Sequence, residues 1–418
     1  MRDAAQQTLP AQGFFIDKIL MGYPPRSYVR SLVTPFNGVA ALILAAGLPI
    51  IVYRFANGLA STTNLSQTSP WGLWIGLDVL SGVALAAGGY TMAASVYVFG
   101  LEKYHPVVRP AVLTGFLGYL FVVIGLLADL GSPWRLPVPI VYSWGTLSVM
   151  FEVSWCVALY LIVLAFEFTP PVFEWLDWPK ARRLALNMAL PLTILGLVLS
   201  TLHQSSIGAL FLLAKDKVHP LWYSPYIPLF FFVSSIVAGL SMVIVESALS
   251  HRAFHDQLDP AKPVDLDGIT LGLGRGAAVV LFSYFFLRLQ GFLDGGRWDL
   301  LTTSYGYWFL FEMIGFVLVP SLLYAWATHY RQVAVVRATA AWTVLGIVVG
   351  RINLSIVAMN WSRPVAYVPS WMEIVVSLAI ITLGILTFRW IVNRMPVLHE
   401  DPAYRVSESR GEAHHVAA

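Results

Sequence analysis

Ten long apolar runs, separated by short polar loops, constrain this chain more than any other feature of its sequence. A helix needs roughly 20 mostly apolar residues to cross the hydrocarbon core of a bilayer, and each run is long enough. The runs are centred near Ala45, Ala87, Val122, Val157, Leu195, Ile236, Val280, Ile314, Ile347 and Ile380. Only 12% of the 418 residues are charged, whereas soluble domains carry about 25%. The sequence therefore predicts an all-α integral membrane protein with about ten transmembrane helices.

The basic residues predict which way these helices run. With ten spans and a cytoplasmic N-terminus, 18 of the 26 Lys and Arg residues fall on the cytoplasmic side and 8 on the other side. Cytoplasmic loops are the ones enriched in Lys and Arg, so both termini are expected in the cytoplasm. The chain then divides into a cytoplasmic segment at 1–33, a transmembrane helical domain at 34–394 and a cytoplasmic tail at 395–418.

The loops on the opposite side are rich in Trp, Pro and Gly, as in "GSPWRLPVPIVYSWG" and "NWSRPVAYVPSW". Tryptophan is typical of the membrane interface, and this explains most of these residues. Sparsely charged, ordered loops also suit the docking of another subunit. In the last loop, Ser370 followed by Glu373 predicts a capping box at the start of the tenth helix.

His203 is a functional candidate because an ionisable side chain inside a span is costly. It lies in the fifth run, with Ser200 and Ser206 three residues to either side and so on one helical face. Gln204 is adjacent but turned by about 100°. The predicted topology places this group in the outer half of the membrane. The alternative is a structural histidine, hydrogen-bonded to a neighbouring helix.

Glu152 is the second candidate, because we expect it near the middle of the fourth span. Trp144, Ser148 and Glu152 are four residues apart and would share one helical face. A carboxylate at mid-membrane must be protonated, paired or part of a proton path. Packing of a protonated glutamic acid is the alternative.

Further polar residues come from other spans but fall toward the same outer leaflet. They are Asp78, Asp129, Glu312, Arg351 and Asn353. We therefore expect one polar pocket that opens near the outer surface, with Glu152 leading inward. On the inner side, Glu246 is a candidate for the intake of protons, although most polar groups there are ordinary interfacial residues.

The cofactor chemistry is limited by a few residue types. The single cysteine, Cys156, excludes a Cys-ligated iron–sulfur cluster within this chain. Haem held by two histidines needs both at membrane depth, and of nine histidines only His203 is clearly inside a span. No Walker A, GxSxG or HExxH motif is present. A quinone site or a transporter remains.

A quinone site suits the polar residues better than a transporter does. Quinone carbonyls accept hydrogen bonds, and quinone reduction takes up two protons with two electrons. A histidine, hydroxyls and an acid beside an apolar cleft meet that need. A transporter would more often show discontinuous helices in paired repeats, and no such repeat is evident.

Three long segments resemble one known family. They are "EKYHPVVRPAVLTGFLGY", "DLGSPWRLPVPIVYSWGTLSVMFEVSWCVALY" and "STLHQSSIGALFLLAKDKVHPLWYSPYIPLFFF". From roughly Pro70 to Glu246 the chain resembles the NrfD/polysulfide-reductase membrane subunits, and within them the hydrogenase-2 (HybB) type. The later spans fit that family in number and hydropathy only.

The resemblance implies a function that composition alone does not. Family members are haem-free, lie in the inner membrane of prokaryotes, and bind menaquinone or ubiquinone near the outer face. They exchange electrons with a peripheral iron–sulfur subunit, which in HybB-type complexes serves a periplasmic nickel–iron hydrogenase. Relatives work with molybdopterin oxidoreductases for polysulfide or formate, or with multihaem cytochromes. A non-redox ion transporter is the remaining alternative.

The resemblance also assigns residues. For proton transfer it points to Glu152 and Asp129, and the positions of Asp78 and Glu246 within their spans add these two. For quinone binding the matching residues are His203, Gln204 and Ser205, with His219 and Trp222 in the "HPLW" loop. Ser206, Trp144 and Arg351 join the binding set from their positions. No metal site is expected.

Overall fold

The computed structural model describes residues 13–255 and 264–398. Within these ranges the chain is helical, apart from loops and one isolated β-bridge between Ser66 and Ser69. Ten helical segments of this described part are long and apolar enough to cross a membrane. They confirm the predicted all-α fold and its ten spans. The spans are Pro35–Asn57, Trp74–Val98, Glu102–Asp129, Val149–Trp175, Ala189–Ala214, Ile227–Ala253, Leu266–Gly295, Ser304–His329, Val333–Asn360 and Trp371–Val392.

Spans 1, 6, 7 and 10 are single helices, whereas the other six are built from two or more segments. The single helices are α2 (Pro35–Asn57), α11 (Ile227–Ala253), α12 (Leu266–Gly295) and α17 (Trp371–Val392). Span 2 consists of η3 (Trp74–Ser81), α3 (Gly82–Leu85), α4 (Gly88–Ala93) and η4 (Ala94–Val98), and span 3 consists of η5 (Glu102–Val107) and α5 (Val108–Asp129). Span 4 consists of α7 (Val149–Glu167) and α8 (Thr169–Trp175), and span 5 consists of α10 (Ala189–Ala209) and η7 (Leu212–Ala214). Span 8 consists of α13 (Ser304–Phe311), η10 (Glu312–Leu318) and α14 (Val319–His329), and span 9 consists of α15 (Val333–Ile352), η11 (Asn353–Val357) and α16 (Ala358–Asn360). Short helices outside the spans are η1 (Phe15–Ile19), α1 (Pro25–Ser31), η2 (Leu59–Ser61), η6 (Pro133–Arg135), α6 (Val138–Val141), α9 (Pro179–Asn187) and η9 (Trp298–Thr302).

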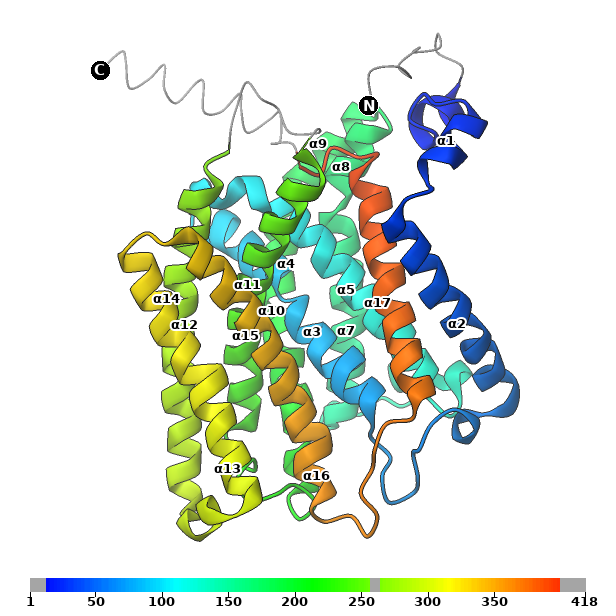
Figure 1. Ribbon diagram of the computed structural model, residues 1–418. Helices are drawn as coiled ribbons and strands as arrows, with labels where there is room; N and C mark the ends of the chain where they lie inside the picture. Colours follow the sequence, from blue (N-terminus) through cyan, green and yellow to red (C-terminus); the bar gives the residue numbers. More distant parts are fainter. Residues whose placement is uncertain (1–12, 256–263, 399–418) are drawn as a thin grey trace.

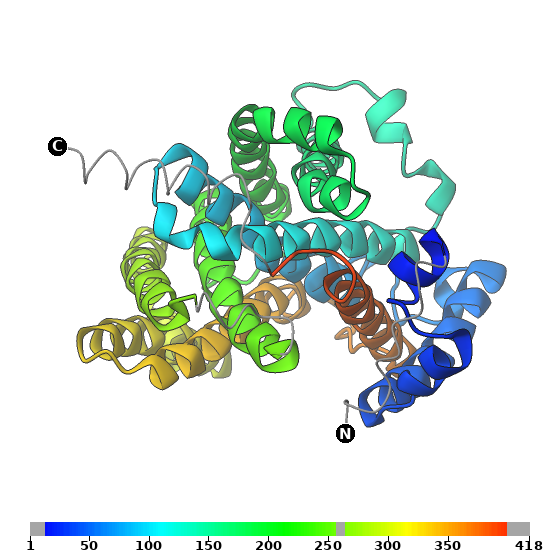
Figure 2. The ribbon, with the colours of Figure 1, turned by 90° about the horizontal axis from the view of Figure 1, so that it is seen from above.

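The spans form two four-helix bundles and one helix pair. Spans 2 to 5 make the first bundle and spans 6 to 9 the second, joined where α11 packs against α3, α4 and α10. Helices α2 and α17 pack together, and α17 also covers α5 of the first bundle. Seen from above, the second bundle and the α2–α17 pair lie on opposite sides of the molecule (Figure 2).

Helix α2 begins and α17 ends at the same end of the molecule (Figure 1). We call this the near end and the opposite one the far end. An even number of spans requires this arrangement, and which end faces the cytoplasm stays a prediction. Residues 1–12 and 399–418, parts of the two predicted cytoplasmic segments, lie outside the described residues.

Glycines let the two bundles approach at their backbones. A Cβ on Gly239 of α11 would lie 2.8 Å from the Ala87 carbonyl carbon and from the Gly88 nitrogen. In turn, a Cβ on Gly88 would meet the Val243 side chain at 3.0 Å. Small residues at helix crossings allow the close van der Waals packing that replaces the hydrophobic effect inside a membrane. Span 6 is therefore held tightly against span 2.

Three of the polar residues singled out from the sequence sit on π-helical turns. Asp78 lies within η3, Glu312 begins η10 and Asn353 begins η11. Such turns are rare and are found frequently at functional sites. In both bundles, therefore, a span departs from regular α-helix at a buried polar side chain.

Glu152 does not lie near the middle of its span, contrary to the prediction. Helix α7 begins at Val149 with Ser148 as its N-cap, so Glu152 belongs to the first turn at the far end. Trp144 precedes the helix and cannot share a helical face with Glu152. The apolar residues before it form the separate short helix α6, and a loop at 143–148 divides α6 from α7. The capping box of Ser370 and Glu373 is confirmed at the start of α17.

Candidate functional site

His203 lies on α10 at the centre of a buried polar group in the first bundle. Its Nδ1 donates to the Leu199 carbonyl at 2.6 Å, and its Nε2 is hydrogen-bonded to the Tyr119 hydroxyl. Because a carbonyl only accepts, the proton resides on Nδ1 and the Tyr119 hydroxyl donates to Nε2. The side chain is fully buried. Both ring nitrogens are therefore engaged within the protein.

Gln204 reaches the same tyrosine from the next position on α10. Its amide nitrogen lies 3.4 Å from the Tyr119 hydroxyl and donates to the Val83 carbonyl at 3.1 Å. His203 and Gln204 are offset by about 100° around α10. The Tyr119 hydroxyl of α5 nevertheless contacts both side chains. Ser206 donates instead to the Leu202 carbonyl of its own helix at 2.9 Å. Ser205 is half-buried beside these residues.

Two buried hydroxyls beside His203 have no partner at hydrogen-bonding distance. They belong to Tyr160 and Ser200, and both are shielded from solvent. The Tyr160 ring centroid is 5.5 Å from that of His203 and 4.8 Å from that of Tyr119. Tyr90 is tied to Ser235 of α11 at 3.1 Å. Hydroxyls can both donate and accept, so this group can pass a proton along.

We call these residues the His203 cluster: Tyr90, Tyr119, Tyr160, Ser200, His203 and Gln204. Sequence reasoning found the members on α10 and missed the three tyrosines. Tyrosine is common in apolar spans as a packing residue, so its type alone carries no signal. Tyr119 and Tyr160 do close two of the segments that resemble the known family, which is the one hint that the sequence contains.

A second polar site lies in the first bundle at the near end. A cavity of about 40 Å³ is bordered by Glu167, His105, Arg109 and Thr193 among others. The Glu167 carboxylate accepts from the Thr193 hydroxyl at 3.0 Å. Glu167 lies seven residues, or two helical turns, from Tyr160 on α7, and Thr193 has the same spacing from Ser200 on α10. This near-end cavity thus lies about two helical turns from the His203 cluster, toward the near end. Sequence reasoning did not single out Glu167.

Asp78 and Asp129 come together at the far end. The Asp78 carboxylate accepts from the Ser377 hydroxyl of α17 at 2.7 Å, and a Cβ on Gly125 of α5 would lie 3.1 Å from the Asp78 Cβ. Asp129 ends the same helix one turn later. One of its carboxylate oxygens is buried without a hydrogen-bond partner. We call this pair the far-end acids.

Arg54 of α2 borders the far-end acids. Its Nε donates to the Ala128 carbonyl at 2.7 Å, and its terminal nitrogen to the Leu130 carbonyl. The guanidinium thereby caps the end of α5, where carbonyls lack helical partners. Both acids lie at the same end of the molecule, as the prediction of a shared leaflet requires. That this end is the outer one stays a prediction.

Glu152, Trp144 and Glu246 lie apart from the His203 cluster. Glu152 is half-buried on the first turn of α7, and no hydrogen bond or ion pair joins its side chain to the described residues. The Trp144 ring is 66% exposed and 5.2 Å from Trp155. Glu246 is buried in the near-end half of α11, close to Thr114, and neither carboxylate oxygen has a partner at hydrogen-bonding distance.

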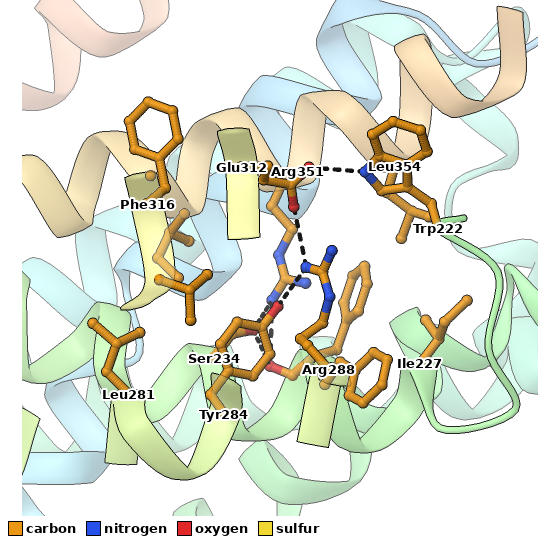
Figure 3. A pocket seen from close by; sticks show the side chains of 16 residues that line it. Trp222, Ile227, Ser234, Leu281, Tyr284, Arg288, Glu312, Phe316, Arg351 and Leu354 are labelled. Atoms are coloured by element: carbon orange, nitrogen blue, oxygen red, sulfur yellow. Dashed lines mark hydrogen bonds and ion pairs between the residues drawn. The ribbon is translucent and has the colours of Figure 1, made fainter. Parts of the chain in front are cut away.

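Trp222 and Arg351 belong to a different site, inside the second bundle. They line a cavity of about 40 Å³ together with Arg288, Tyr284 and Glu312 (Figure 3). No described hydrogen bond joins these side chains to His203. The single outer pocket expected from the sequence is therefore split between the two bundles. The reason is that hydropathy places residues by depth but does not assign them to a bundle.

His219 holds the far-end loop that leads to Trp222. Its ring stacks on Tyr305 at 4.6 Å, and its backbone nitrogen donates to the Ala358 carbonyl at 2.8 Å. Its Nδ1 accepts from the Leu221 backbone nitrogen at 3.2 Å. Burial lowers the pKa of His219 from its ordinary value of 6.5. The imidazole is thus neutral at pH 7 and fixes the loop by stacking and hydrogen bonding.

The described histidines do not suit haem ligation by a histidine pair. Apart from His203, the histidines of the spans lie within four residues of an end: His105, His251 and His329. The Nε2 of His203 already binds a tyrosine. Among the described residues no group of three or more His, Cys, Asp or Glu side chains could hold a metal ion. Away from the span ends, His203 is the single imidazole of the described spans.

The comparisons with known proteins agree with this arrangement of spans. Residues 61–361 match the family described as "Polysulphide reductase, NrfD". A Nitratidesulfovibrio vulgaris protein is 50% identical over 378 residues, 90% of this chain and 97% of its own. The "Probable Ni/Fe-hydrogenase 2 b-type cytochrome subunit" of Escherichia coli is 31% identical over 397 residues, 94% of this chain and 99% of that protein.

A more distant relative is the "Menaquinone reductase, integral membrane subunit" of Nitratidesulfovibrio vulgaris. It is 24% identical over 381 residues, which cover 84% of this chain and 88% of the relative. The family match extends from the loop before span 2 to the end of span 9 and so includes both bundles. With ten apolar helices and a relative more than 30% identical along nearly its whole length, this chain is a multi-pass integral membrane protein of the NrfD family.

Proposed function

We propose that this chain is the quinone-reactive membrane subunit of a respiratory oxidoreductase complex in the inner membrane of a prokaryote. It exchanges electrons between a peripheral iron–sulfur subunit and menaquinone or ubiquinone. Relatives named as subunits of a hydrogenase and of a menaquinone reductase support this role. The observation that carries it is the His203 cluster, a buried chain of hydroxyls and one imidazole in a bundle of apolar helices.

The far-end acids suit a quinone head group. A quinone supplies two carbonyl oxygens, which accept hydrogen bonds and take up protons on reduction. Asp78 packs against Gly125, one helical turn before Asp129. The buried Asp129 oxygen without a partner is a group that can donate to such a carbonyl when protonated. His203 has no free ring nitrogen to offer. We therefore assign His203 and Tyr119 to the relay of protons and the far-end acids to the quinone.

Protons reach this site from the near end in the proposal. The near-end cavity opens toward Glu167, and the unpartnered hydroxyls of Tyr160 and Ser200 lie between Glu167 and His203. Buried polar atoms without partners are sites for ordered water, and water completes the path. His203 accepts a proton at Nε2 from the Tyr119 hydroxyl and returns it through the same nitrogen, because its Nδ1 proton is held by the Leu199 carbonyl. Glu246 is the alternative carboxyl for proton intake.

The far-end loops are the proposed docking face for the iron–sulfur subunit. The segment between α5 and α7 exposes large apolar side chains at Trp134, Tyr142 and Leu147, which are 77%, 79% and 100% exposed. Exposed apolar patches of this kind mark interaction surfaces. The excess of Lys and Arg at the near end supports a cytoplasmic position for that end. The docking face is then periplasmic.

The catalytic partner is proposed to be a nickel–iron hydrogenase, on the strength of the Escherichia coli relative. A relative named as part of a selenate reductase of Mesobacillus selenatarsenatis, 24% identical over 407 residues, favours a different reductase as second candidate. Purification of the native complex distinguishes them, because the copurified catalytic chain contains nickel and iron in one case and molybdenum in the other. If neither catalytic chain copurifies and vesicles that contain only this chain show ion flux, a transporter would be favoured instead.

A structure of the complex with a quinone analogue tests the quinone site. We expect density for the head group beside Asp129 and Asp78. Density in the second bundle, with none at the far-end acids, would contradict the assignment. Retention of quinone reduction by the complex after removal of this chain would contradict the function itself.

A further inference from the structure

The cavity of the second bundle contains two arginines but one carboxylate. Arg288 of α12 pairs with Glu312 at 3.1 Å, and Arg351 of α15 faces the same cavity (Figure 3). The side chains of Arg288 and Glu312 are 11% and 3% exposed, and Arg351 as a residue is 5% exposed. Charges within a span are costly and nearly always paired. The cavity thus carries one positive charge in excess among the described residues.

Glu312 is fully used by neighbours other than Arg351. One carboxylate oxygen accepts from Arg288, and the other accepts from the Trp222 indole at 2.8 Å and the Asn353 amide at 2.7 Å. None of these bonds joins Glu312 to Arg351. Its charge is balanced by Arg288, so it leaves Arg351 uncompensated.

Arg351 has donors that the protein does not satisfy. One terminal nitrogen donates to the Phe231 carbonyl at 3.2 Å and to the Ser234 hydroxyl at 3.0 Å. The guanidinium stacks over the Phe231 ring at 3.5 Å. Its Nε is buried with no hydrogen-bond partner. Arginine retains its charge in proteins, so this site requires a compensating group.

Tyr284 supplies a second free donor to the same cavity. Its oxygen accepts from Arg288 at 3.1 Å, which leaves the hydroxyl hydrogen available. Ser234 cannot play this part, because its hydroxyl donates to the Phe231 carbonyl at 3.1 Å. Figure 3 shows Tyr284 and the two arginines pointing toward one another. Free donors and an excess positive charge therefore meet in one small cavity.

We propose that the second-bundle cavity binds one small monovalent inorganic anion, of the chloride class, between Arg351 and Tyr284. The charge of the anion balances Arg351, and its lone pairs accept from the unsatisfied donors. A cavity of about 40 Å³ is small, because a single water needs about 10–15 Å³ of such space. A halide with one or two waters fits, whereas a quinone head group or a lipid phosphate is too large. The site is independent of the quinone site in the first bundle.

Halide-dependent stability of the purified complex tests this site. The complex is exchanged into gluconate buffer and titrated with chloride or bromide at constant ionic strength, and its thermal unfolding midpoint is recorded. We expect a saturable rise of the midpoint with either halide in the native complex. Arg351→Gln removes the charge and should weaken the apparent halide affinity by about tenfold or more, since a hydrogen bond to a charged group contributes about 1.5–3 kcal/mol. Tyr284→Phe should weaken it less.

Arg337→Gln is the matched control, because Arg337 pairs with Asp267 at the surface of the same bundle. This variant should keep the halide response of the native complex. A midpoint that is the same in gluconate, chloride and bromide would overturn the proposal and leave water as the occupant. If the Arg351→Gln complex does not assemble, anomalous scattering from bromide-soaked crystals of the native complex tests whether the cavity binds a halide. A bromide peak beside Arg351 supports the proposal, and its absence refutes it.

Discussion

Tyr119 and His203, on α5 and α10, are joined by a hydrogen bond from the tyrosine hydroxyl to the Nε2 of the imidazole. The opposite ring nitrogen donates to the Leu199 carbonyl. The imidazole is therefore held in one tautomer by partners on both sides. This pair is the centre of the proposed proton path, and it can be tested without disturbing the far-end acids.

Tyr119→Phe should slow quinone reduction by the intact complex by about tenfold or more. The change removes the hydroxyl that links His203 to Gln204 and leaves the packing ring in place; groups that move protons in catalysis contribute about 10²–10⁴-fold. Turnover with the natural electron donor measures the effect. Tyr324→Phe is the control, since Tyr324 is equally buried but bonded to Ser241 in the second bundle. Equal turnover of both variants would contradict the relay.

His203→Gln should also impair turnover, while the complex still assembles. Glutamine can accept from Tyr119 but has no titratable nitrogen, so the proton path is interrupted. His203→Ala should in addition destabilise the chain by about 1–3 kcal/mol, because the hydrogen of the Tyr119 hydroxyl is left buried without an acceptor. Turnover and unfolding midpoints of both variants separate the two effects. Native turnover in both would remove His203 from the mechanism.

Glu167→Gln should reduce quinone-linked proton uptake from the near end. The amide keeps a hydrogen bond to Thr193 but cannot carry a proton inward. Complexes in vesicles, with a pH dye on the side of the near end, measure the uptake. Glu246→Gln is the matched comparison, because it removes a buried carboxyl on α11 that lies outside the near-end cavity. If Glu246→Gln blocks uptake and Glu167→Gln does not, the route through the near-end cavity is wrong.

Glu152→Gln should lower the rate of quinone reduction with little loss of stability. Glu152 is in the first turn of α7, where a carboxylate stabilises a helix by about 0.3–1 kcal/mol through the helix dipole. The small stability effect and the rate effect are measured on the same preparation. A native rate with normal assembly would limit Glu152 to its helix-end role.

The stability of the far-end loop should fall as the pH drops below the ordinary histidine pKa of 6.5. Burial lowers the pKa of His219 in the folded chain, so below pH 6.5 the unfolded chain binds more protons than the folded one. Stability then decreases with falling pH until the lowered folded pKa is reached. Unfolding midpoints between about pH 5 and 8 measure this. In His219→Gln, the part of the slope due to this residue should disappear.

The depth of each polar residue could be predicted from the sequence, but its partners could not. Hydropathy located ten spans, and the spacing of Ser370 and Glu373 identified a capping box that the structure contains. The pairing of Tyr119 with His203 joins residues 84 positions apart, and no local pattern encodes such a contact. By sequence, Arg288 is one more basic residue near the outer end of a helix. Its ion pair with Glu312 depends on how α12 packs against η10.

Glu152 shows where hydropathy misleads. The apolar residues Ile140 and Val141 before it extend the run, so hydropathy starts the span earlier than Val149. These residues belong instead to the separate short helix α6, and a loop through Gly145 follows before α7 begins. The far-end acids were predictable in depth for the opposite reason, because their helices are continuous up to the loop.

The sites at Asp78, Glu312 and Asn353 depend on the number of residues in their π-helical turns as well as on the side chains there. A π turn holds about one more residue than an α turn, so deletion of one residue within it returns the turn to regular α-helix and leaves the residues beyond on nearly the same face. Deletion of one residue after Asp78 in η3 would thus keep the loops and the face that the rest of span 2 presents to α5, but remove the widened turn that holds Asp78. In such a protein, a gain or loss of one codon could create or abolish a buried polar site without changing any side chain in it.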